Sequence, residues 1–144
     1  MGVEDIVLKL MKKHHTNDPF KIAKAEGITI LYQDLGKVCG YFRSYKRVPI
    51  IHINNSLDLY MQRLVCAHEL GHAILHPGVN TAFFKRNTFL STDKIEIEAN
   101  SFSAFLLIPE ESLFDSYEQK TIYDIAALHH VPVELVELKF KGLF

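Results

Sequence analysis

The sequence lacks long apolar runs, which argues against a membrane protein. One of its longest apolar stretches, residues 102–108, falls far short of the roughly 20 residues that a membrane-spanning helix needs. The first residues are acidic, and they do not form an apolar segment followed by a small-residue cleavage site. We therefore expect no secretory signal and no membrane attachment.

Cysteine is also scarce. The chain has only two cysteines, Cys39 and Cys66, which are too few for a disulfide framework. Proteins of reducing compartments commonly have this pattern, because their thiols stay reduced there. We therefore predict a cytoplasmic protein.

The sequence has no excess of charge of either sign. Sixteen lysines and arginines stand against 17 aspartates and glutamates. Nonspecific nucleic-acid binding needs a positive field that neutralises phosphates. The balance therefore predicts a protein that does not bind nucleic acid directly.

The distribution of apolar residues predicts one α+β domain over residues 1–144. β-branched and aromatic runs predict a small antiparallel or mixed sheet of about three strands, at residues 28–32, 38–45 and 49–53. Helical periodicity predicts helices at residues 3–13, 19–26, 57–76, 94–107, 122–130 and 132–141. A short helical turn is expected just after Pro109, and Thr121 with Asp124 has the spacing of a capping box. Residues 54–56 offer caps for the central helix, and residues 79–92 are typical of a loop or irregular hairpin. We expect the sheet to pack on the helix of residues 57–76, with further helices at the C-terminus.

The central helix carries His68-Glu69-Leu70-Gly71-His72. Residues four apart lie on the same face of a helix, so the two imidazoles can bind one tetrahedral zinc ion. Glu69 is rotated by about 100° from His68, beside the metal, where its carboxylate can act as general base for zinc-bound water. This spacing on a helix is a known signature of metallopeptidases.

The alternative is a chance match on a solvated helix face. Both histidines, however, belong to the apolar stripe of the helix, where unpaired imidazoles would be costly to bury. We therefore favour a metal site.

A catalytic zinc site needs a third protein ligand and one open position. His76 is a poor candidate, because on a continuous helix it lies about 12 Å along the axis from His68. It fits better as a residue that contacts a ligand than as a ligand itself.

The next helix offers two carboxylates as the third ligand, Glu96 and Glu98. Glu96 shares a narrow strip with small and polar residues, among them Asn100, which could orient a ligand. Glu98 shares its strip with Phe102 and Phe105, whose bulk would hold the two helices apart. Glu96 also has the spacing of a capping box with the aspartate three positions before it. We favour Glu96 and keep Glu98 as the alternative.

Residues 66–76 together with residues 95–109 resemble the ImmA/IrrE family of bacterial and mobile-element zinc metallopeptidases. The likeness joins the His-Glu-x-x-His motif to a Glu-x-x-Ala-Asn-x-Phe pattern that begins at Glu96 and to a Leu-Leu-x-Pro stop. The resemblance implies a minimal thermolysin-like (zincin) fold, Zn²⁺ held by His68, His72 and Glu96, and Glu69 as the base. It also implies an anti-repressor of a phage or mobile element, an endopeptidase that cleaves a helix-turn-helix transcriptional repressor.

Two other functions compete with the endopeptidase. The first is a metal-bound module that sequesters a regulator without cutting it, which would not need Glu69. The second makes the C-terminal helix pair a DNA-binding helix-turn-helix. Its last helix carries Lys139 and Lys141 against Glu134 and Glu137, which argues for a packing or partner role.

Overall fold

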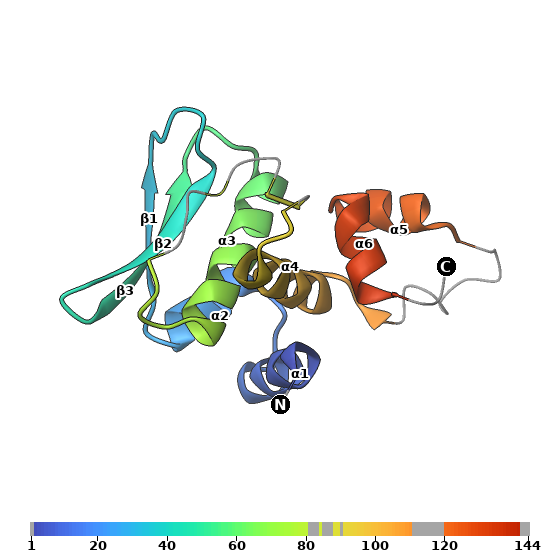
Figure 1. Ribbon diagram of the computed structural model, residues 1–144, viewed down its shortest axis with the longest axis horizontal. Coiled ribbons are helices and arrows are strands. Elements are labelled where there is room, and N and C mark those ends of the chain that lie inside the picture. The colour runs from blue at the N-terminus through green and yellow to red at the C-terminus, as the bar shows by residue number, and fades with distance from the viewer. Residues whose placement is uncertain (1, 81–83, 85–87, 90, 111–119, 142–144) are drawn as a thin grey trace.

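A computed structural model describes residues 2–80, 84, 88–89, 91–110 and 120–141 of the chain. It has an α+β architecture, with the strands in the first half and three helices following the central one (Figure 1). The elements are α1 (Val3–His14), α2 (Pro19–Ala25), β1 (Thr29–Gln33), β2 (Gly40–Tyr45), β3 (Val48–Asn54), α3 (Leu59–Leu75), α4 (Lys94–Leu107), α5 (Ile122–His129) and α6 (Val133–Lys139). The predicted fold class is confirmed.

The three strands form a mixed sheet in the order β1-β3-β2. β1 runs parallel to β3, with Leu31 opposite His52, and β2 runs antiparallel to β3, with Tyr41 opposite the same histidine. The β2–β3 connection is short enough for a hairpin, whereas the parallel pair needs a longer crossover. The sequence had left open whether the sheet was antiparallel or mixed, and the β1–β3 pairing decides for mixed.

Helix α3 lies between the sheet and α4 (Figure 1). Its contacts with α4 are close at Gly71, where an added Cβ would lie 3.0 Å from Cβ of Phe102. The prediction that Phe102 holds α4 away from α3 is therefore wrong, because the absence of a side chain at Gly71 makes room for the ring. Helix α4 can thus bring its polar residues up to the histidines of α3.

The start of α3 differs from the prediction. Residues 54–56 do not cap it; the Asp58 side chain does, by accepting a hydrogen bond from the Met61 N–H at 2.8 Å. The Asn54 amide instead donates to the carbonyls of Gly36 and Val38, at 3.0 and 2.9 Å. Asn54, the last residue of β3, therefore binds the β1–β2 connection rather than the helix.

The other predicted connections are partly described. Thr121 and Asp124 form the predicted capping box at the start of α5. In the region of residues 79–92, the expected loop or irregular hairpin, Phe84 forms an isolated antiparallel bridge with Gly40. The helical turn expected just after Pro109 lies outside the described residues. Within the described part of the chain, no helix has both the length and the apolar character needed to cross a membrane.

Candidate metal centre

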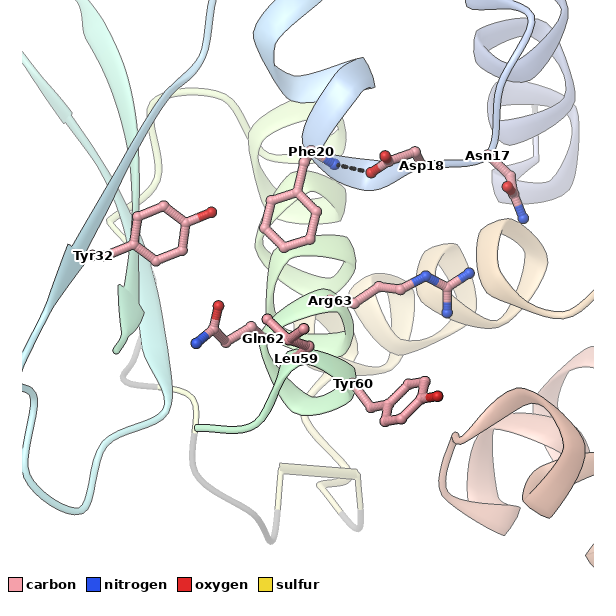
Figure 2. Close-up of a pocket in the computed structure, with 8 residues that line it drawn as sticks. All are labelled: Asn17, Asp18, Phe20, Tyr32, Leu59, Tyr60, Gln62 and Arg63. Atoms are coloured by element: carbon pink, nitrogen blue, oxygen red, sulfur yellow. Dashed lines mark hydrogen bonds between the residues drawn. The ribbon is translucent and has the colours of Figure 1, made fainter. Parts of the chain in front are cut away.

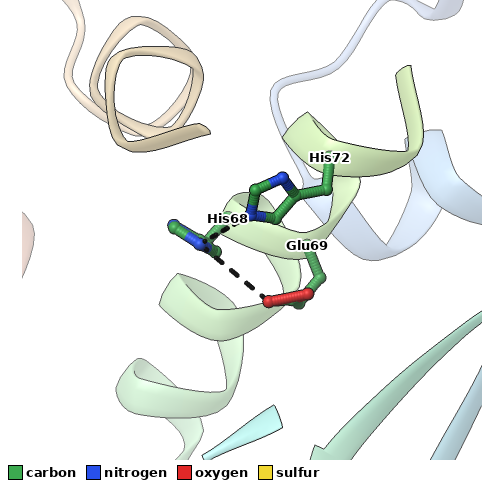
Figure 3. Close-up of side chains that lie close together, drawn as sticks. All are labelled: His68, Glu69 and His72. Atoms are coloured by element: carbon green, nitrogen blue, oxygen red, sulfur yellow. Dashed lines mark hydrogen bonds and ion pairs between the residues drawn. The ribbon is translucent and has the colours of Figure 1, made fainter. Parts of the chain in front are cut away.

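His68 and His72 lie side by side on the face of α3 that meets α4 (Figure 3). Both imidazoles are buried, and their Nε2 atoms are 3.2 Å apart. The distance follows from the helix itself, because residues four apart stand one turn above each other. The two rings therefore aim one nitrogen each at the same point.

Glu69 is fully buried beside this pair (Figure 3). Its Oε1 lies 4.0 Å from Nε2 of His68. Within the described part of the chain, His68, Glu69 and His72 form a group whose possible metal-ligand atoms all lie within 4.8 Å of one another. The carboxylate is thus adjacent to the two imidazole nitrogens but not between them.

Glu96 of α4 stands between the two imidazoles. Its Oε2 lies 3.0 Å from Nε2 of His68, and its Oε1 lies 2.9 Å from Nε2 of His72. The residue is not part of a capping box, since the cap of α4 is made by Asp93 accepting from the Ile95 N–H, while the carboxylate of Glu96 turns to α3. Burial raises the pKa of Glu96, whereas hydrogen bonds and charges from the two histidines, with their Nε2 atoms protonated, would hold it at about 2. Glu96 is therefore an anion at neutral pH.

Asn100 determines which nitrogen of His68 carries a proton. The Asn100 Nδ2 donates to the carbonyl of Thr88 at 3.2 Å, so its Oδ1 is the atom that faces Nδ1 of His68, at 2.9 Å. An amide oxygen only accepts, which places the proton on Nδ1 and leaves a lone pair on Nε2 of the neutral ring. Burial is the largest cause that lowers the pKa of His68, and it favours that neutral ring.

His76 and Glu98 orient His72 in the same way. Oε1 of Glu98 accepts from Nε2 of His76 at 3.4 Å, and Nδ1 of His76 lies 3.0 Å from Nδ1 of His72. With its proton on Nε2, a neutral His76 accepts at Nδ1 from the Nδ1–H of His72. Nε2 of His72 is then left with a lone pair directed at Glu96. His76 and Glu98 lie one contact away from the convergent atoms, and neither faces His68.

These tautomers direct two lone pairs and one carboxylate at a common point. Three acceptors at 2.9 to 3.2 Å repel one another unless a cation lies between them. Ligands of tetrahedral zinc, at about 2.0–2.1 Å from the ion, are about 3.3 Å from each other. Two imidazoles and one carboxylate are also a common protein ligand set of catalytic zinc. The residues present therefore fit a zinc ion.

Phe84 is a residue of this centre that the sequence pattern did not single out. Its ring meets the His68 imidazole edge to face, with centroids 4.4 Å apart, and it is 1% exposed. An aromatic residue in a loop-like stretch gives no periodic signal, so only its tertiary position reveals the contact.

A separate cavity of about 470 Å³ opens between the start of α2, β1 and the first turn of α3 (Figure 2). Tyr32, Tyr60 and Arg63 are among the side chains around it. None of the residues predicted for the metal site lines this cavity. It is lined by the first residues of α3, whereas His72 lies near the other end of that helix.

Comparison with known proteins identifies the family of the chain. Residues 23–141 match the peptidase M78 family, described as the IrrE N-terminal-like domain. The chain is 39% identical over 140 residues to a protein called uncharacterized immunity region protein 2 of Bacillus phage phi105, a match that covers 95% of this chain and 88% of the phage protein. It is 33% identical over 147 residues to metallopeptidase ImmA of Bacillus subtilis (strain 168), with 99% of this chain and 86% of the relative covered. The chain therefore belongs to the ImmA/IrrE family of metallopeptidases, the M78 peptidases.

Proposed function

We propose that this protein is a cytoplasmic zinc endopeptidase that cleaves a helix-turn-helix repressor of a phage or mobile element. The observation that carries the proposal is the convergence of His68, His72 and Glu96 on one point, with the Glu69 carboxylate beside it. The family supports peptide hydrolysis, and one relative is named for a phage immunity region. A repressor is the substrate that the family resemblance suggests.

In this proposal His68, His72 and Glu96 hold the ion. A bound zinc ion would supply Lewis acidity, which makes water nucleophilic near neutral pH and polarises the scissile carbonyl. Asn100 and the His76–Glu98 pair keep the protons on the Nδ1 atoms, so that both Nε2 atoms are available as ligands.

Glu69 takes a proton from the attacking water on its carboxylate and passes it to the departing amine. It is not a ligand in this scheme, because its Oε1 lies 4.0 Å from His68 Nε2 whereas the Glu96 oxygens lie 2.9 and 3.0 Å from the imidazoles. Complete burial excludes bulk water from the carboxylate and strengthens its interaction with the charges near it.

Glu69→Gln tests hydrolysis against sequestration. The amide keeps the size of the side chain but does not accept a proton at neutral pH, so zinc content and repressor binding should persist. Cleavage should fall by about 10²–10⁴-fold, the usual contribution of a positioned general base. The measurement is the rate at which fragments of the repressor encoded beside this gene appear by mass spectrometry.

Glu98→Gln is the matched control, since it makes the same chemical change at a carboxylate that faces His76. It should lose far less cleavage than Glu69→Gln does, because the amide oxygen still accepts from His76 and only the orientation of His72 is affected. If Glu69→Gln releases the repressor's promoter in cells as fully as the unaltered protein does, hydrolysis is not the mechanism. The protein would then act by sequestering the regulator.

A further inference from the structure

The cavity of about 470 Å³ beside the first turn of α3 takes no part in the proposed peptide hydrolysis. Its volume falls in the range of pockets that hold small organic ligands, roughly 300–1,000 Å³. Aromatic side chains from three elements surround it, Phe20 of α2, Tyr32 of β1 and Tyr60 of α3 (Figure 2). Tyr32 is 51% exposed and Tyr60 is 54% exposed. The cavity therefore presents flat apolar surface to the solvent.

The aromatic wall on the α3 side is fixed before any ligand binds. The Tyr60 ring stacks on the His130 imidazole, with centroids 3.6 Å apart and 15° between the two planes. On the other side of the cavity, the Tyr32 hydroxyl points toward Phe20 (Figure 2). A ligand that enters beside a ring already held in place loses less free energy to ordering of the protein.

Arg63 differs from the other polar side chains that line the cavity. The side chains of Asn17, Asp18 and Gln62 each bond to a backbone group of the protein, at 3.3, 2.9 and 2.8 Å. The half-buried Arg63 guanidinium forms no hydrogen bond and no ion pair with the described residues. A guanidinium has five N–H donors, and donors that lose water without gaining a partner cost free energy. A ligand with an acceptor group can supply that partner.

Further basic side chains lie near Arg63. Burial first, and then the charges of Arg63 and Lys120, lower the pKa of His129, so these basic groups lie near one another. Asp18 is the acidic side chain of the lining, and it raises the pKa of Arg63 against the larger, lowering effect of burial. With Arg63 and Lys120 against Asp18, the charge near the cavity is positive, which favours an anionic ligand.

We propose that this cavity binds a small aromatic carboxylate, whose carboxylate accepts from the Arg63 guanidinium and whose flat rings lie against Tyr32 and Tyr60. The planar fork of an arginine matches the two oxygens of a carboxylate, and aromatic rings favour stacked or edge-to-face contacts with one another. The inference goes beyond the proposed function, because it uses neither the zinc ion nor hydrolysis. It assigns a ligand site to the first turn of the helix that carries His68 and His72 further along.

The test measures the binding of 2-naphthoate to the zinc-loaded full chain by equilibrium dialysis. A dissociation constant of about 1 mM or lower is expected for a ligand of this size. Two further probes separate the parts of the ligand, since 2-naphthamide keeps the rings without the charge and acetate keeps the charge without the rings. Both should bind at least about tenfold more weakly, because each lacks one of the two contacts.

Arg63→Gln should weaken naphthoate binding about tenfold or more, because it removes the cation that the carboxylate contacts. Arg47→Gln is the matched control, since it makes the same change at an exposed arginine of the β2–β3 turn that does not line the cavity, and it should leave the affinity unchanged. Asp18→Asn should strengthen naphthoate binding a few-fold, because it removes the negative charge of the lining while asparagine still caps α2. Damage to the fold does not produce such a gain.

Equal naphthoate affinity of Arg63→Gln and the unaltered protein would overturn the site, and naphthoate that bound to the zinc ion instead would give this result. Naphthoate that binds no more tightly than naphthamide would overturn it as well. Thermal unfolding shows whether Arg63→Gln is folded. If it is not, Asp18→Asn decides, and an unchanged or lower naphthoate affinity in that variant would refute the proposal.

Discussion

At the scale of single residues, the chemistry depends on which carboxylate faces which imidazole. Glu96 contacts both His68 and His72, at 3.0 and 2.9 Å, whereas Glu98 contacts His76 at 3.4 Å and has a side chain that is 36% exposed. Two glutamates two positions apart on one helix thus have different surroundings. The difference predicts different consequences for the same substitution.

Glu96→Gln should weaken zinc binding more than Glu98→Gln does. The first change removes a negative charge from the point where two lone pairs converge, while the second leaves an amide oxygen that still accepts from His76. Replacing a group that only orients a ligand typically costs about 10–100-fold in metal affinity, and the conservative amide should cost less. Competition titration against a zinc indicator gives both affinities.

His68→Ala provides the reference for complete loss in that titration, because it removes a nitrogen at the centre of the site. Since metal bound only by the folded state adds to the free energy of folding, His68→Ala should also lose the stabilisation by zinc. Loss of zinc in Glu98→Gln with retention in Glu96→Gln would contradict the assignment. Glu98 would then be the ligand.

At the scale of elements, the site depends on how closely α4 approaches α3. The approach is set at Gly71, between the two histidines, where Phe102 packs on the bare backbone. Small residues at helix contacts allow two helices to approach closely. Because protein interiors are close-packed, a single added methyl group at such a contact lowers stability.

Gly71→Ala should therefore disturb both stability and metal binding. An added Cβ lies 3.0 Å from Phe102 Cβ, so overpacking should cost about 1–3 kcal/mol, offset by up to about 1 kcal/mol of better helix propensity. Because the ring is pushed away together with α4, Glu96 should move from the imidazoles and zinc affinity should fall. Denaturant unfolding and zinc titration measure the two effects.

Asp58→Ala is the control for this prediction. It removes the N-cap of the same helix, far from α4, and should cost about 1 kcal/mol of stability while leaving zinc affinity unchanged. If Gly71→Ala and Asp58→Ala affect zinc affinity equally, the close helix contact does not control the site.

At the scale of the whole molecule, buried histidines make stability depend on pH. Burial is the main cause that lowers the pKa of His52, His68 and His129 below the ordinary value of 6.5. The unfolded chain therefore takes up protons at these residues more readily than the folded protein does. Their contribution to stability is present above about pH 6.5 and is lost as the pH falls below it.

The unfolding temperature of the metal-free protein should accordingly decrease as the pH falls from about 7 toward about 5, because this range spans the ordinary histidine pKa of about 6.5. Glu96 adds nothing in this range, since its pKa is held at about 2 and its own contribution is lost only below the ordinary 4.5. Calorimetry at a series of pH values gives the slope. His52→Gln removes one of these three histidines without changing a residue of the metal centre, so it should make the slope shallower. An unchanged slope would contradict the assignment.

The sequence by itself determined the parts of this protein that depend on local geometry. The elements followed from periodicity, and His68, Glu69 and His72 could be proposed as a site because one helical turn sets their relation before any tertiary contact forms. The family followed from the same motif and its companion on α4. Cys66 is free and buried as well, because a cysteine outside the histidine face packs as a small apolar residue.

Only the tertiary structure decided what depends on contacts between distant segments. It turned Glu96 rather than Glu98 toward the histidines, because the rotation of α4 about its axis is set by packing, with Phe102 on Gly71. It placed Phe84 over His68, because pairing with Gly40 joins residues 44 positions apart and leaves no periodic trace in the sequence. It also placed the cap of α3 at Asp58 rather than at residues 54–56, because Oδ1 of Asn54 accepts from Ser56 while its amide donates to the carbonyls of the β1–β2 connection. Local spacing predicts which side chains a single element brings together, whereas the free energy of packing selects the face that each element presents to its neighbours.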